Sequence, residues 1–204
     1  MSYRNQTYVV FDGDSDMWAY AYMRGWKALP MVPFNFHDAH DLGSELTNLA
    51  KEASIKRVLR NRFSSTKQVV VLIGPNTRYL YRFVRWELEV AVELGLPIIG
   101  VNLNGKRDFD PDRCPPIIRD EFVIHVSFKR AIMKYALDDF PDRHAARDRN
   151  LRRPLRYADE VYGRLGLNAA PALVRASIAG RISMALLGGS SPPSSPPWPS
   201  YPTK

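Results

Sequence analysis

The chain has 204 residues, of which 45% are apolar and 25% are charged, enough for one main domain of about 150 residues and an appendage. Its single cysteine, Cys114, excludes an internal disulfide and a multi-cysteine zinc site, and favours a reducing, cytoplasmic setting. No apolar run reaches the roughly 18 residues that a membrane span needs, so we expect neither a signal peptide nor a transmembrane helix.

The first part of the chain alternates between apolar runs typical of strands and segments with apolar residues at helical spacing. In chain order we predict strand 8–11, helix 16–29, strand 34–36, helix 53–63, strand 68–74 and helix 78–94.

The alternation continues with strand 97–103, a Gly- and Pro-rich loop at 104–116, strand 122–126 and helix 128–140. This order predicts an α/β fold with a parallel five-stranded sheet flanked by helices. The default arrangement of five such strands is flavodoxin-like, with the order 2-1-3-4-5. We therefore place the main domain at residues 7–140.

The composition changes after residue 140. Residues 144–156 are highly charged and predict a loop or irregular helix, and helices follow at 157–167 and 172–187. We predict a helical extension over 141–187 and a Pro/Ser-rich tail over 188–204 that cannot form a packed core.

The extension region is also basic. Residues 129–181 hold 12 Lys/Arg and 6 Asp/Glu, a surplus of +6, whereas residues 1–128 hold 16 and 15, a surplus of +1. Such a surface is either a solvated helical face or a contact for nucleic acid or an acidic partner. Because it lacks the interleaved aromatic residues of single-strand binders, we do not expect nucleic acid as a partner.

Three polar loops are expected at the carboxyl ends of the strands, where ligands of open parallel sheets bind. They are residues 12–16, 37–41 and 74–78. Neither the Rossmann glycine fingerprint nor a P-loop occurs in the sequence, so a dinucleotide would have to be held in another way.

His37 and His40, with Asp38 and Asp41, form the one cluster that suggests a metal site. Hydrated loop residues at a strand end have the same pattern, and no third histidine lies nearby in the sequence, so we expect no metal. Cys114 precedes two prolines and has only Arg113 beside it to lower its pKa, so we do not expect a nucleophile there.

Glu87 is unusual for a residue of the helix predicted at 78–94. Its neighbours at helical spacing are all apolar: Phe83, Val84, Val90 and Ala91. A carboxylate in such surroundings costs free energy unless it has partners or a ligand, and such groups often have shifted pKa values and a function. Two interpretations stay open: a functional carboxylate, or a core-edge glutamate held by a backbone amide or by Arg60 or Arg62.

The segment from Thr77 through Trp86-Glu87-Leu88-Glu89 to Ala91, preceded by Val69-Val70-Val71-Leu72-Ile73-Gly74, resembles the TIR-like domain of the signal-producing protein of Thoeris anti-phage defence systems (ThsB-type, DUF1863-like). Residues 34–41, 54–56 and 97–102 add to the resemblance, which covers about 7–140. It implies a TIR-like fold.

In that family a glutamate on this helix is catalytic, and the matching residue here is Glu87. The resemblance implies cleavage of NAD between nicotinamide and ribose, with the carboxylate stabilising an oxocarbenium-like transition state. NAD would be a substrate, and no cofactor is expected. The product would be ADP-ribose or a cyclic or conjugated derivative. Residues expected to bind the substrate are Phe11, Asp12, Gly13, Asp38, Asp41, Thr77 and Trp86, although Trp86 equally suits simple packing.

The same fold also serves as a non-catalytic module that assembles defence or signalling complexes, with Glu87 in a structural role. The partners expected from the resemblance are NAD, an effector protein reached through a diffusible nucleotide, and further copies of this chain. No membrane contact is expected.

Overall fold

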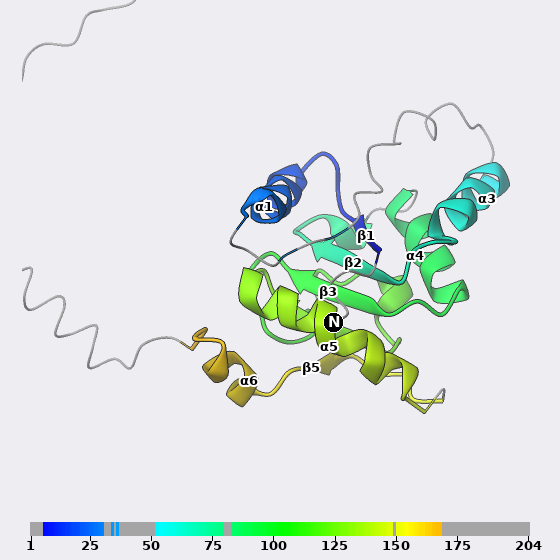
Figure 1. Cartoon of the computed structure of the whole chain (residues 1–204). Coiled ribbons are helices and arrows are strands. Elements are labelled where there is room, and N and C mark those ends of the chain that lie inside the picture. The colour runs from blue at the N-terminus through cyan, green and yellow to red at the C-terminus, as the bar shows by residue number, and fades with distance from the viewer. Residues whose placement is uncertain are drawn as a thin grey trace, which may run out of the picture. The chain divides into compact units, whose positions relative to one another are not determined.

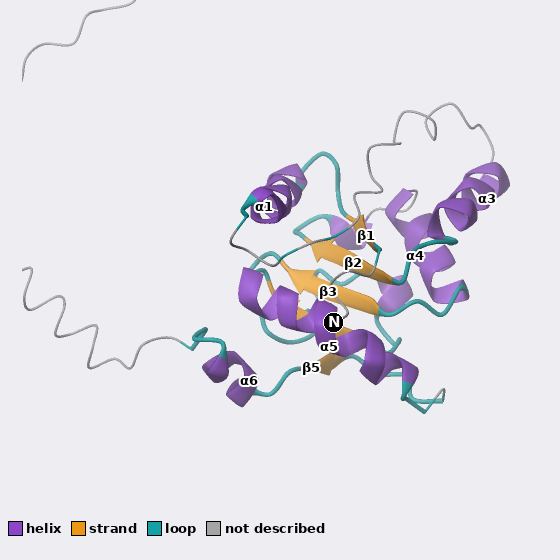
Figure 2. Cartoon of the chain, in the orientation of Figure 1, coloured by secondary structure: helices purple, strands orange, loops and turns teal. Residues whose placement is uncertain are grey.

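The computed structural model describes residues 6–30, 34, 36, 52–79, 83–148 and 150–168. The chain divides into one unit of residues 1–166 and another of 167–204, and every helix and strand named below belongs to the first. Figures 1 and 2 show this unit as an α/β fold whose central sheet has helices on both faces.

The sheet has five strands, all parallel, in the order β1-β2-β3-β4-β5. They are β1 Thr7–Val10, β2 Gln68–Ile73, β3 Ile98–Asn102, β4 Val123–Ser127 and β5 Leu155–Arg156. Every residue of the first four strands is buried, as continuous apolar strands covered on both faces require. The predicted α/β fold with a parallel five-stranded sheet is confirmed.

The strand order differs from the predicted order 2-1-3-4-5 at the two edges, because β1 lies at one end of the described sheet and an additional strand pairs with β4 at the other. Phe34 and Phe36 were expected in a strand, but both lie outside the strands, and Phe36 packs against Phe34 and Tyr20. The fifth strand is instead β5, where we expected a loop or irregular helix. It pairs with β4 through only two residues, too few to leave a periodic pattern in the sequence.

The helices follow the predicted spacing closely. They are α1 Met17–Ala28, α3 Glu52–Phe63, α4 Phe83–Glu93, α5 Arg130–Ala145 and α6 Asp159–Arg164, with the 3-10 turns η2 Thr77–Tyr79 and η3 Pro116–Ile118. Residues 80–82 of the helix predicted at 78–94 and the helix predicted at 172–187 lie outside the described residues. In the described part of the chain, no helix is both long and apolar enough to cross a bilayer.

Helix α5 passes through Pro141, although we predicted its end at residue 140. Proline lacks an N–H and removes one helical hydrogen bond, yet packing can compensate for that loss. His144, one turn beyond Pro141, is buried, and its ring lies 5.8 Å from Phe140 and 6.0 Å from Phe122. These contacts hold the additional turn.

Two helical layers enclose the sheet. Tyr8, Val69 and Val71 belong to the core cluster shared with α3 and α4, whereas the buried Val9 and Val70 alternate to the other face and lie outside that cluster. Helices α1 and α5 lie on that other face (Figure 1). The two layers leave Glu87 of α4 facing the same side of the sheet as Tyr8.

Gly100, at the centre of the sheet, allows a buried histidine to fit beside it. His125 pairs with Gly100 across β3 and β4, is fully buried, and packs its ring against Phe109 at 5.4 Å. A Cβ at position 100 would lie 2.8 Å from Nδ1 of His125 and 3.1 Å from Cδ1 of Ile73. The absence of a side chain at this position is therefore a packing requirement.

We expect Gly100→Ala to lower the free energy of unfolding by about 1–3 kcal/mol, because the added methyl group overpacks the sheet. Gly25→Ala is the matched control, since an added Cβ at that position in α1 meets no heavy atom within 4 Å. That variant should be more stable than the wild type by roughly 0.5–1 kcal/mol. Urea unfolding followed by circular dichroism measures both, and equal effects of the two substitutions would contradict this packing.

Candidate functional site

Two of the three loops predicted at the carboxyl edge of the sheet meet in the structure. The side chain of Asn76 donates a hydrogen bond to Ser15 Oγ at 3.4 Å, and Thr77 Oγ1 donates to Asp16 Oδ2 at the same distance. Asp12 accepts from the backbone N–H of Asp14 at 3.0 Å and from the hydroxyl of Ser15. The loop after β1 is thus joined to the loop after β2, as the parallel topology predicts.

The carboxylate of Asp16 is buried where the two loops meet. It is only 1% exposed, and Oδ1 has no hydrogen-bond partner among the described residues. Burial and the neighbouring carboxylate of Asp12 raise the pKa of Asp16 to about 6, against the hydrogen bond from Thr77 and the charge of Arg113. The carboxylate lies against Gly74, where a Cβ would collide with both of its oxygens.

The remaining residues predicted in these loops have different surroundings. Phe11 is buried, and its ring stacks on Tyr20 at 4.6 Å, so it supports the loop from the core. Gly13 is exposed in the turn. Thr77 is buried, and its hydroxyl also accepts a 2.7 Å hydrogen bond from the backbone N–H of Gly74. Asp38 and Asp41 lie outside the described residues, as does the whole cluster considered for metal binding.

Glu87 is buried in the middle of α4 with 6% of its surface exposed. The hydroxyl of Tyr8 on β1 donates a 2.7 Å hydrogen bond to Oε1 of Glu87. Tyr8 is itself held by an edge-to-face contact with Phe63, the last residue of α3, at 4.6 Å between ring centroids. A strand and two helices therefore fix the position of this carboxylate.

The protonation equilibrium of Glu87 lies close to neutrality. Burial raises the pKa of Glu87 to about 7, and the Tyr8 hydrogen bond and the positive charge of Arg62 act in the opposite direction. Burial, followed by the charge of Glu87, raises the pKa of Tyr8 far above that of an ordinary phenol. Tyr8 therefore stays protonated and remains a donor while Glu87 changes its protonation state.

The structure shows which of the two arginines proposed from the sequence, Arg60 or Arg62, acts on Glu87. Arg62 contributes a favourable charge to Glu87, whereas Arg60 pairs with Glu93 through two contacts of 3.1 and 2.8 Å. Tyr8 was not among the predicted partners. The only signal for it was its place in an apolar strand, which does not tell which helical residue it meets.

Glu87 and the joined loops are separate parts of the domain. Tyr8, the partner of Glu87, pairs with Val69 near the start of β2, whereas Asp16 and Thr77 lie beyond the ends of β1 and β2. Within the described ranges, no hydrogen bond or ion pair joins Glu87 to these loops. The structure brings Asp12 and Thr77 into one cluster and leaves Glu87 with Tyr8 in another.

Trp86 packs against the core that α3 and α4 share, and its ring meets Phe83 edge to face at 5.8 Å. Cys114 is buried, and its burial raises the pKa of the thiol to about 12, so the thiolate is scarce at neutral pH. The described residues include no group of three or more His, Cys, Asp or Glu placed to hold a metal ion.

A parallel sheet with helices on both faces and polar loops at its carboxyl edge is the architecture of flavodoxin-like and TIR-like α/β domains. Residues 8–108 match the family model described as Thoeris protein ThsB, TIR-like domain. This match covers just under half of the chain, so the chain is similar to this family, and the match supports a context of anti-phage defence. Comparison with curated proteins gives no match.

The burial of Glu87 has a measurable consequence for stability. Folding raises the pKa of Glu87 from an ordinary 4.5 to about 7. Its favourable contribution to the free energy of unfolding is therefore fully present below pH 4.5 and is lost as the pH rises through 7. Glu87→Gln removes this titration. We expect the variant to gain about 1–3 kcal/mol relative to the wild type between pH 5 and pH 8.5.

Urea unfolding at the two pH values measures that gain, with Glu93→Gln as the control on the same helix. Glu93 is exposed and ion-paired with Arg60, so its replacement should not produce a relative gain at high pH. If Glu87→Gln and the wild type lose stability in parallel as the pH rises, Glu87 does not have the raised pKa described above.

Proposed function

We propose that this chain is an enzyme of anti-phage defence that cleaves NAD at the bond between nicotinamide and ribose, with Glu87 as the catalytic residue. The observation that supports this most is the buried carboxylate of Glu87 on α4, held by Tyr8 inside the region that matches the TIR-like family. A buried carboxylate with a pKa near neutrality is a frequent property of active sites.

The reaction requires stabilisation of positive charge. The bond between ribose C1′ and the nicotinamide nitrogen breaks, both bonding electrons go to the nitrogen, and neutral nicotinamide leaves. Positive charge then develops on the ribose, where the Glu87 carboxylate stabilises it by Coulomb attraction that a buried site strengthens. This parallels the oxocarbenium-like transition state of glycoside hydrolysis.

The nucleophile that adds to C1′ decides the product. Water forms the new C–O bond, releases a proton and gives ADP-ribose, whereas an atom of the adenine ring gives a cyclic nucleotide. A second small molecule gives a conjugate. Exclusion of water favours the last two outcomes. In this proposal the product leaves the enzyme and activates a separate effector protein in the cytoplasm.

Tyr8 is the positioning residue in this scheme. Its hydrogen bond fixes one oxygen of Glu87 and stabilises the charged form, which the chemistry requires. Asp12 is buried, and its two oxygens already accept hydrogen bonds from the backbone N–H of Asp14 and from the hydroxyl of Ser15, so it holds the loop in this scheme. The hydroxyl of Thr77 is already engaged with Gly74 and Asp16, so Thr77 shapes the loop rather than contacting the substrate.

We expect Glu87→Gln to reduce the release of nicotinamide from NAD by at least a hundredfold, because the neutral amide cannot stabilise the cationic transition state. Chromatography of nicotinamide measures the rate with purified protein, and in phage-infected cells where a trigger is needed. Glu93→Gln, the same substitution at an exposed position six residues further along α4, should keep the activity. The wild-type rate should rise with pH across about 7 as Glu87 loses its proton.

Mass spectrometry of small molecules from infected cells, with the wild type and Glu87→Gln side by side, identifies the product. Persistence of the wild-type product in the variant would show that Glu87 is not catalytic. Absence of nicotinamide release from the wild type under infection would overturn the proposed reaction itself.

One observation favours the alternative function as an assembly module. Helix α1 exposes three large apolar side chains, with Met17 50%, Trp18 47% and Tyr22 60% exposed, and the rings of Trp18 and Tyr22 lie side by side with centroids 6.1 Å apart. Exposed apolar patches of this kind often mark protein contacts. A homo-oligomer that forms through α1 is compatible with catalysis at α4 and can accompany it.

If α1 mediates self-association, Tyr22→Gln should weaken it at least fivefold in sedimentation velocity experiments over a range of protein concentrations. The matched control is Tyr79→Gln, which removes an aromatic ring of similar exposure, 57%, from a different element. A wild-type protein that stays monomeric at all concentrations would contradict the assembly function.

A further inference from the structure

A pocket of about 270 Å³ lies beside α4, between its first turns and the turn η3. Most of its walls are apolar, formed by Val84, Leu88, Pro115, Pro116 and Ile117, and its polar side is formed by Thr77, Arg78 and Arg85. Small-molecule sites generally combine mostly apolar walls with a few placed polar groups, although most are somewhat larger.

This pocket is distinct from the surroundings of Glu87. Val84 and Leu88 occupy neighbouring positions on one side of α4, and Glu87 instead meets Tyr8 of β1 and the charge of Arg62 of α3. Neither Tyr8 nor Glu87 lines the pocket. A ligand in the pocket would therefore contact the same helix as the proposed catalytic site without occupying that site.

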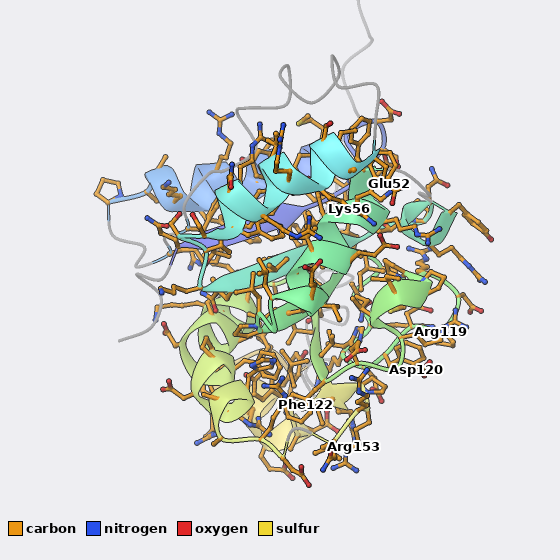
Figure 3. All side chains as sticks on the ribbon, turned by 90° about the vertical axis from the view of Figure 1, so that its right-hand side faces the viewer. Glu52, Lys56, Arg119, Asp120, Phe122 and Arg153 are labelled. Atoms are coloured by element: carbon orange, nitrogen blue, oxygen red, sulfur yellow. The ribbon has the colours of Figure 1, made fainter. Side chains whose placement is uncertain are left out.

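Charge at the rim of the pocket is not balanced. Arg85 pairs with Glu89 at 2.7 Å, and Glu89 also pairs with Lys56, which reaches Glu52. These four side chains have no net charge. Figure 3 looks onto the layer of α3 and α4 and labels the α3 members of this network, Glu52 and Lys56.

Arg78 supplies the excess charge. Its Nη1 donates to the carbonyl oxygen of Asp112 at 2.9 Å, and its guanidinium lies 5.2 Å from the ring of Tyr79. No carboxylate lies within ion-pair distance of Arg78 in the described ranges. The carbonyl contact holds the side chain at the rim but leaves other N–H donors of its planar fork for an anion.

The wall opposite α4 is rigid before any ligand arrives. Pro115 and Pro116 have fixed φ angles, and Ile118 at the end of η3 is fully buried in the core shared with α4. Because the pocket is already formed, binding of a ligand costs little conformational entropy of the protein, which favours binding.

We propose that this pocket binds a small amphipathic anion, with a compact apolar body against the prolines, Val84 and Leu88 and a carboxylate or phosphate group paired with Arg78. Guanidinium groups recognise both anions through paired hydrogen bonds. Among the described residues that line the pocket, Thr77 is engaged with its own loop, so the arginines supply the polar contacts for a ligand.

Phenyl phosphate and phenylacetate are suitable probes, since each joins a compact ring to one of the two anionic groups. Titration into the ¹⁵N-labelled full chain, followed by NMR, should shift the amides of α4 and η3. The probe that binds more tightly identifies the preferred anion. Inorganic phosphate has only the anionic group, and benzyl alcohol has the aromatic ring without an anionic group. Each should therefore bind at least tenfold more weakly.

Arg78→Gln should weaken binding of the better probe at least tenfold. Arg153→Gln makes the same change at an exposed position outside the pocket (Figure 3) and should change the affinity less than twofold. Ile117→Trp, which fills the pocket from its partly exposed wall, should also reduce binding at least tenfold. Thermal unfolding of each variant verifies that it is folded.

Three results would overturn the proposal: equal binding by Arg78→Gln and the wild type, inorganic phosphate binding as tightly as phenyl phosphate, or amide shifts confined to residues outside α4 and η3. None of these measurements uses NAD cleavage. The pocket proposal and the proposed function therefore succeed or fail independently.

Discussion

A carboxylate removed from water must be matched by donors or positive charge, and in this domain the hydrogen bond from Tyr8 to Glu87 provides the match. The bond ties the edge strand β1 to α4, and Phe63 of α3 fixes the ring of Tyr8 in turn. Burial and the donors act in opposite directions on the pKa of Glu87, and the balance lies near neutrality. Both the charged and the uncharged form of this buried group are therefore populated near neutral pH.

The carboxyl edge of the sheet is organised by a different constraint. Asp16 is buried beside Asp12, and Gly74 has no side chain that would occupy the space of the Asp16 carboxylate. Because Thr77 contacts both Gly74 and Asp16, it joins the loops after β1 and β2. The acidic side chains of Asp12 and Asp16 at this edge thus hold the loop structure.

Helix α4 connects the two proposals. One side presents Glu87 to β1 and α3, while the neighbouring side presents Val84 and Arg85 to the pocket closed by η3. Rigid elements carry displacement at one surface to another because packed cores resist gradual deformation. A small anion paired with Arg78 of η2 would contact Val84 and Leu88 of the helix that positions the Glu87 carboxylate.

The sequence by itself determined the parallel α/β architecture, because four apolar strands alternate with helices whose spacing is clear. It also identified Glu87, since a carboxylate with only apolar neighbours at helical spacing is conspicuous. Tertiary structure alone decided that Tyr8 and Arg62 are its partners and that Arg60 belongs to Glu93, because helical spacing gives no information on contacts between elements distant in the chain. Only the fold could place β5 at the sheet edge and leave Phe34 and Phe36 outside the strands, since two-residue pairing and aromatic packing have no periodic signature.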